Sequence, residues 1–132
     1  MREKLTAQGY LEGVDFELDS AGTGDWHLGH SPDARSQQVC ESHGIDISGM
    51  RARKFIVQDG KKYDFIFGMD KNNLDDMKVV IDSDHMNKLH LFDTHEVNDP
   101  YYGILDGFEI MYQQLELAAE RWVRTWQDSD GL

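Results

Sequence analysis

The sequence is poor in several features that define whole classes of protein. It contains a single cysteine, Cys40, among 132 residues, which excludes an intrachain disulfide. No apolar run is long enough for a signal peptide or a membrane-spanning helix. These two absences favour a reducing compartment, and we expect the protein to be cytoplasmic.

Basic residues are also scarce. Thirteen lysines and arginines stand against 25 aspartates and glutamates, which gives a formal net charge of -12 at pH 7. Such a charge opposes non-specific binding to nucleic acid or to an anionic membrane, so we expect neither as a partner. Repeats are absent, and 132 residues are enough for one hydrophobic core but too few for two. We therefore expect a single domain over residues 1–132.

The sequence does contain a regular succession of strands and helices. The apolar run at residues 63–69 predicts a strand buried on both faces, residues 71–80 predict a helix, and residues 88–92 predict another strand. This order predicts an α/β fold, an open parallel sheet with helices on both faces. Ligands of such sheets bind outside the carboxyl ends of the strands.

The remaining segments have weaker or more local signals. Residues 1–8 read as a helix without an N-cap, residues 16–21 alternate like a half-buried strand, and residues 32–44 predict a helix capped by Ser31. The last helix is predicted from an apolar stripe that should face the sheet, formed by Phe108, Met111, Tyr112, Leu115, Ala118, Ala119 and Trp122.

The most distinctive stretch runs from Asn98 to Gly103 and reads Asn-Asp-Pro-Tyr-Tyr-Gly. Proline and glycine after an aspartate are ordinary turn chemistry. Two adjacent tyrosines in a loop have no periodicity that would bury both, so we expect at least one ring to face a cleft or a ligand. An acid beside aromatic rings suits the protonation of an aryl leaving group.

Together with three other segments, this stretch resembles the low-molecular-weight protein-tyrosine phosphatases. The others are residues 20–26, the stretch from residues 43–45 to 51–53, and residues 65–70 followed by Asn73 and Leu74. They occur in the family's order and spacing and span nearly the whole chain. The resemblance implies hydrolysis of phosphotyrosine in proteins, or of small aryl phosphates, through a cysteinyl-phosphate intermediate and without a cofactor.

The resemblance also assigns roles to individual residues. Asp99 corresponds to the general acid that protonates the departing phenol. Trp26, Tyr101 and Tyr102 correspond to the residues that contact the substrate ring, and the paired tyrosines favour phosphotyrosine over phosphoarginine.

Two further residues have supporting roles by resemblance. Ser20 corresponds to a residue that helps to hold the nucleophile loop in shape. Asp70 corresponds to an aspartate that many family members place against a histidine, and Met50 stands where that histidine would be.

The family's nucleophile loop, a cysteine and an arginine separated by five residues, does not occur in these 132 residues. The residue six positions after Cys40 is Asp46, and we expect Cys40 to be a small buried residue and not a replacement nucleophile. We expect the chain to be N-terminally truncated, to lack the family's first strand, and not to turn over substrate by itself.

Other interpretations remain open. The chain could be an inactive relative that binds phosphorylated or other proteins through Trp26, Tyr101 and Tyr102, or a strand-exchanged homo-oligomer built on an open sheet. Asp25, His27 and His30 are of types that bind zinc, but they form a single cluster in a glycine-rich loop, so we expect no metal.

Overall fold

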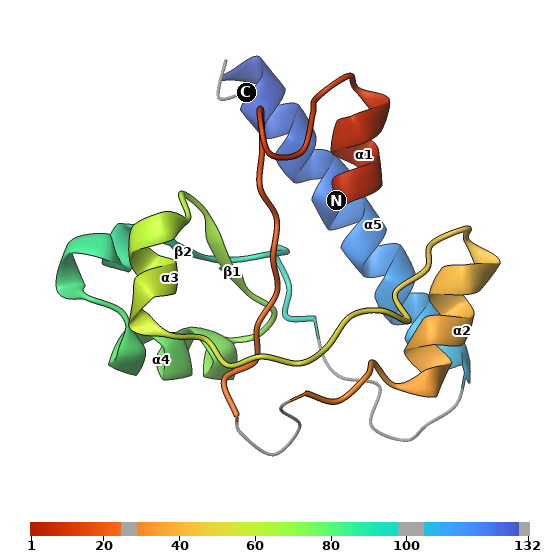
Figure 1. Ribbon diagram of the computed structural model, residues 1–132, viewed down its shortest axis with the longest axis horizontal. Helices are drawn as coiled ribbons and strands as arrows, with labels where there is room; N and C mark the ends of the chain where they lie inside the picture. Colours follow the sequence, from red (N-terminus) through yellow and green to blue (C-terminus); the bar gives the residue numbers. More distant parts are fainter. Residues whose placement is uncertain (25–28, 98–104, 130–132) are drawn as a thin grey trace.

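The computed structural model describes residues 1–24, 29–97 and 105–129. In chain order its elements are α1 (Arg2–Ala7), α2 (Ala34–Ser42), α3 (Val57–Lys62), β1 (Ile66–Gly68), α4 (Lys71–Val80), the 3-10 helix η1 (Ser83–Lys88), β2 (Leu89–Leu91) and α5 (Leu105–Asp128) (Figure 1). Within these residues, no helix has the length and apolarity needed to cross a bilayer.

The sheet of the described residues consists of β1 and β2. The two strands are parallel, with Ile66 opposite Leu89 and Gly68 opposite Leu91. Helix α4 and η1 connect them, which is the strand, helix, strand unit that the sequence predicts. The predicted α/β fold with a parallel sheet is therefore confirmed.

Adjacent residues of β1 bury their side chains on opposite faces of the sheet. Ile66, 8% exposed, packs with Phe55, Met77 and Ile81 on the side of α4. Phe67 packs against a second buried cluster, on the side of α5, formed by Phe92, Ala118 and Ala119, as do the partly buried Met1, Met69, Leu115 and Trp122. This alternation is the geometry of a strand with helices on both faces.

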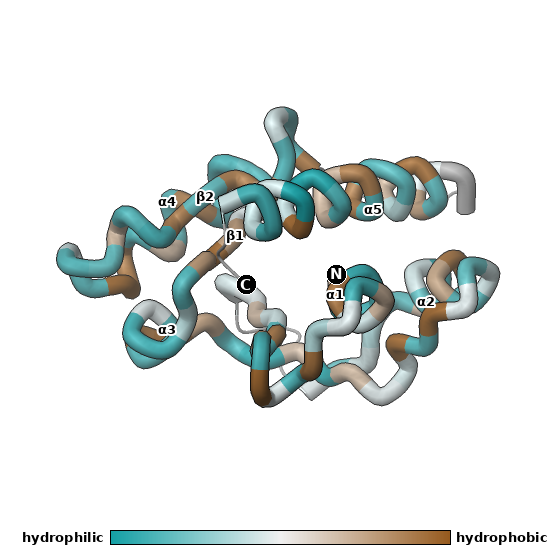
Figure 2. Tube along the Cα trace, turned by 90° about the horizontal axis from the view of Figure 1, so that it is seen from above, coloured by the Kyte–Doolittle hydropathy of each residue, from teal (hydrophilic) through white to brown (hydrophobic). Residues whose placement is uncertain are grey.

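Helix α5 is the longest element, and α1 and α2 lie along it (Figure 1). Figure 2 shows hydrophobic and hydrophilic residues alternating along α5, as its predicted stripe requires. Phe108, Ala118 and Ala119 of that stripe are buried, and so is Val123, which the prediction omitted. His43, at the end of α2, stacks on Tyr112 with ring centroids 4.0 Å apart.

Two predictions about local structure are wrong, and the bounds of a third element are too wide. Residues 16–21 form no strand; the nearest pairings are isolated bridges between Glu12 and Phe16 and between Gly22 and Lys54. Alternating polarity reports side-chain burial, whereas a strand also needs a hydrogen-bonded neighbour along its length. The strand predicted at residues 63–69 is shorter, and Phe65 before it is 44% exposed.

The third correction concerns the start of α2. Asp33, and not Ser31, is the N-cap, because its carboxylate accepts a hydrogen bond from the Arg35 backbone N–H. The same carboxylate is held by the Arg35 side chain at 2.8 Å. These contacts lower the pKa of Asp33 to about 2, and the bond from the Arg35 side chain has the largest effect.

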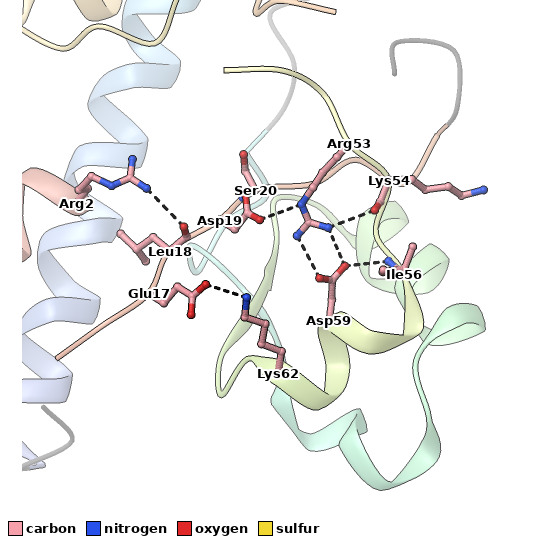
Figure 3. Close-up of polar contacts among 10 residues, drawn as sticks. All are labelled: Arg2, Glu17, Leu18, Asp19, Ser20, Arg53, Lys54, Ile56, Asp59 and Lys62. Carbon is pink, nitrogen blue, oxygen red and sulfur yellow. Dashed lines mark hydrogen bonds and ion pairs between the residues drawn. The ribbon is translucent and has the colours of Figure 1, made fainter. Parts of the chain in front are cut away.

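A buried ion pair joins α3 to the segments that precede it (Figure 3). Both Asp59 carboxylate oxygens accept from the Arg53 guanidinium, at 3.0 and 3.1 Å, and one also accepts from the Ile56 N–H at 2.9 Å. Arg53 also donates to Asp19 at 3.0 Å. Burial by itself raises the pKa of Asp59, but the bonds from Arg53 and Ile56 outweigh it, and the pKa lies below its ordinary value.

We expect Asp59→Asn to lower the free energy of unfolding by about 1–3 kcal/mol at pH 7, because it breaks charge-assisted hydrogen bonds to a carboxylate that is only 10% exposed. Asp64→Asn, which changes an exposed side chain, should have little effect and serves as the control. Urea unfolding measures both.

The same pair has a defined pH dependence. The folded-state pKa of Asp59 is depressed, so its contribution is fully present above the unfolded pKa, about 4, and is lost as the pH falls through the folded value. The gap in stability between the wild type and Asp59→Asn should therefore close below about pH 4. A gap that stays constant on acidification would contradict this account.

Candidate functional site

The candidate site lies where the chain leaves the carboxyl ends of β1 and β2. The Phe92 N–H donates to the Gly68 carbonyl at 3.0 Å, and the Val97 N–H donates to the Met69 carbonyl at 2.7 Å. Val97 is buried and is the last described residue before residue 98. The segment that leads to Asp99 is therefore fixed beside the carboxyl end of β1.

Asp70 lies at this edge and begins α4. Its carboxylate accepts a hydrogen bond from the Asn73 N–H at 2.8 Å. In return, the Asn73 side-chain oxygen accepts from the Met69 N–H at 3.1 Å. These two bonds fix the turn after β1. Each needs a short side chain with an oxygen that can accept from the backbone, which explains why an aspartate and an asparagine occur three residues apart here.

The segment after β2 is bound to α5 through Asp93. The Asp93 carboxylate accepts from Arg121 at 2.7 Å, from Gln114 at 2.9 Å and from the Thr94 N–H at 2.8 Å. Its side chain is 13% exposed. The Arg121 guanidinium, helped by Gln114 and opposed by burial, lowers the pKa of Asp93 to about 2, so the carboxylate is ionised at neutral pH.

Ser20 lies in a different part of the described structure, on an open groove of about 560 Å³. The groove is lined by Ser20, Ala21, Gly22, His30, Ser31, Pro32, Asp33, Met50, Arg51, Ala52 and Arg53. Its walls are held by backbone bonds: the Gly22 N–H donates to the Arg53 carbonyl at 2.7 Å, and the Ala52 N–H donates to the His30 carbonyl at 2.9 Å. These bonds fix the two segments that flank residues 25–28.

Four of the six residues assigned by resemblance fall outside the described residues. They are Trp26, Asp99, Tyr101 and Tyr102, and their roles stay predictions. Of the two that are described, Ser20 lines the groove and Asp70 caps α4. Met50, which replaces the expected histidine, is 43% exposed.

Sequence reasoning missed the residues that hold the segment before Asp99. Gln114 and Arg121 are seven residues apart on α5, two helical turns, so they lie on one face of the helix. That spacing was visible in the sequence. Their partner Asp93 could not be identified from the sequence, because no local sequence pattern links it to α5.

Cys40 does not have the properties of an activated nucleophile. Cys40 is half-buried, so the expectation of a buried residue is only partly met. Its partial burial, and after it the charge of Glu3, raises the pKa of its thiol above the ordinary value. A raised pKa reduces the thiolate fraction at neutral pH. His43, three residues away, bonds to Glu109 at 2.8 Å and stacks on Tyr112.

The described residues contain no group of three histidine, cysteine, aspartate or glutamate side chains arranged to hold a metal ion.

Comparison with known proteins places the chain among phosphatases. The profile of the family described as low molecular weight phosphotyrosine protein phosphatase matches residues 1–130. The chain is 40% identical to the low molecular weight phosphotyrosine protein phosphatase of Schizosaccharomyces pombe, over 80% of this chain and 71% of that protein. It is 33% identical to the protein of the same name from Dictyostelium discoideum, over 87% of this chain and 76% of that protein.

Solved structures agree with these sequence matches. A low molecular weight phosphotyrosine phosphatase from Vibrio cholerae superposes with a TM-score of 0.85 at 28% identity, covering 97% of this chain and 84% of that one. A protein tyrosine phosphatase from Entamoeba histolytica gives a TM-score of 0.82 at 27% identity, covering 98% and 83%. The chain therefore belongs to the low molecular weight phosphotyrosine protein phosphatase family.

Proposed function

We propose that residues 1–132 form one phosphatase domain that supplies the general acid and the substrate-binding walls for hydrolysis of phosphotyrosine. The observation that carries this proposal is the bond from the Val97 N–H to the Met69 carbonyl, 2.7 Å long, two residues before Asp99. It brings the segment that leads to the acid to the edge of a parallel sheet where ligands bind.

The chemistry we propose is phosphoryl transfer in two steps. A cysteine thiolate attacks phosphorus, a sulfur–phosphorus bond forms, and the bond from phosphorus to the phenolic oxygen breaks. Asp99 gives its proton to that oxygen as it leaves. Water then attacks phosphorus, and the thiolate departs with release of inorganic phosphate. Trp26, Tyr101 and Tyr102 contact the aryl ring, and no cofactor takes part.

The thiolate has to come from outside these 132 residues. They contain no Cys-x5-Arg, and Cys40 has a raised thiol pKa. A general acid cannot replace a missing nucleophile. We therefore infer that the chain alone does not turn over substrate. Because a cysteine nucleophile must stay reduced, we place the protein in the cytoplasm.

A second candidate is a strand-exchanged homo-oligomer, and one observation favours it. The accessible surface is 8845 Å² for a chain of 15.2 kDa, whereas a compact monomer of this mass exposes roughly 7,100 Å². The excess of about 1,700 Å² is roughly twice the 800 Å² or so that one partner contributes to a standard interface, which leaves enough surface for contact with a second copy. In the described part of the chain, β1 has a single neighbouring strand, so its other edge could accept a strand from a second copy.

The phosphatase proposal predicts how two proteins should hydrolyse p-nitrophenyl phosphate at mildly acidic pH. The chain alone should show no turnover. A loop-bearing protein, meaning the chain joined at Met1 to a segment with a strand and a Cys-x5-Arg-Ser loop, should show turnover. In that protein Asp99→Ala should lower kcat/KM by roughly 10²–10⁴-fold.

The matched control is Asp76→Ala, which removes an exposed carboxylate from α4 and should leave kcat/KM unchanged. Turnover by the chain alone that Cys40→Ser abolishes would overturn the inference about the nucleophile. Equal activity of Asp99→Ala and wild-type loop-bearing protein would overturn the role of Asp99.

The oligomer candidate predicts a mass in solution at least twice that of the chain, measured by light scattering over a range of concentrations. A monomer at every concentration contradicts strand exchange.

A further inference from the structure

Side chains of α5 bind four of the six residues that follow β2. The Trp122 indole N–H donates to the Phe92 carbonyl at 2.7 Å, and Arg121 and Gln114 hold the Asp93 carboxylate. Gln114 also donates to the Glu96 carbonyl at 3.3 Å. We call Asp93, Gln114 and Arg121 the α5 clamp.

The clamp is more than a surface ion pair. The carboxylate of Asp93 is largely buried and accepts from two side chains and one backbone N–H. Exposed pairs contribute little because water and salt screen them, and the Arg121 side chain is itself 45% exposed; the Asp93 carboxylate, however, is only 13% exposed, and its three donors hold it in one geometry. The clamp therefore fixes both the position and the orientation of the backbone at residues 93–96.

The same helix holds both ends of the segment that contains Asp99. Residue 105 begins α5, and Gln114 and Arg121 of α5 bind residues 93–96. Seven residues, 98–104, connect these two ends.

We propose that Asp93, Gln114 and Arg121 are positioning residues for Asp99, acting through the backbone that leads into it. The inference rests on the proposed role of Asp99 as general acid. A general acid must come within hydrogen-bonding reach of the leaving oxygen, and a misplacement of about 1 Å can cost roughly 100-fold in rate. The clamp sets where the chain enters that segment.

The test compares two substrates in the loop-bearing protein. Phenyl phosphate releases a phenol with a pKa of about 10, like that of tyrosine, so it depends strongly on protonation. p-Nitrophenyl phosphate releases a far more stable anion and depends on it less. We measure the ratio of kcat/KM for phenyl phosphate to kcat/KM for p-nitrophenyl phosphate, which a simple loss of folded protein leaves unchanged.

Arg121→Met should lower this ratio by roughly 10-fold, in the same direction as Asp99→Ala but less. Gln114→Met is a second, milder variant, and Arg121→Lys should restore part of the ratio because it keeps a cation near Asp93. Arg124→Met, which removes an exposed arginine one turn along α5, is the control and should leave the ratio unchanged.

A further test does not depend on catalytic activity. In the chain alone, Arg121→Met should speed amide hydrogen exchange at Val97, which is buried and whose N–H bonds to the Met69 carbonyl at the end of the segment that the clamp holds. Unchanged exchange would overturn the clamp. A ratio that falls in Asp99→Ala but not in the clamp variants would overturn the positioning role alone, whereas a ratio unchanged in Asp99→Ala would overturn the proposed function and this inference with it.

Discussion

The hydrogen bond from the Val97 N–H to the Met69 carbonyl is the constraint on which the site depends. It ties the segment after β2 to the turn after β1, and each of these is fixed by contacts of its own. Asp70 and Asn73 hold the turn, while Gln114 and Arg121 hold the segment through Asp93. The parallel pairing of β1 and β2 already puts their carboxyl ends at one edge, and this bond holds the segment that follows β2 against the turn that follows β1 at that edge.

The acidic composition and the anchoring of the site are linked. An unpaired carboxylate shielded from water would be costly, and the side chains of Asp59 and Asp93, 10% and 13% exposed, each have an arginine partner. One pair joins α3 to the segments before it, and the other joins the segment after β2 to α5. Few basic residues are available, and these two act as links between distant segments of the chain.

The sequence predicted those parts of the fold that local pattern decides. The apolar run around Ile66 and the stripe on α5 located β1 and the last helix, because burial on a sheet or helix face leaves a period in the sequence. The strand at residues 16–21 failed because pairing depends on a neighbour that periodicity does not report. Asp93 and its partners lie 21 and 28 residues apart, so no local pattern could reveal them. The assignments of Asp99, Trp26, Tyr101 and Tyr102 came from motif resemblance and stay predictions.

The central claim is that this chain provides an acid and a substrate frame, while the attacking thiolate comes from a segment outside its 132 residues. Mass spectrometry of acid-quenched mixtures with an aryl phosphate tests this most directly, because it locates the phosphorylated cysteine. The account predicts a phosphate adduct on the cysteine of the added loop in the loop-bearing protein, and none on Cys40 in either protein. A phosphorylated Cys40 in the chain alone would contradict it.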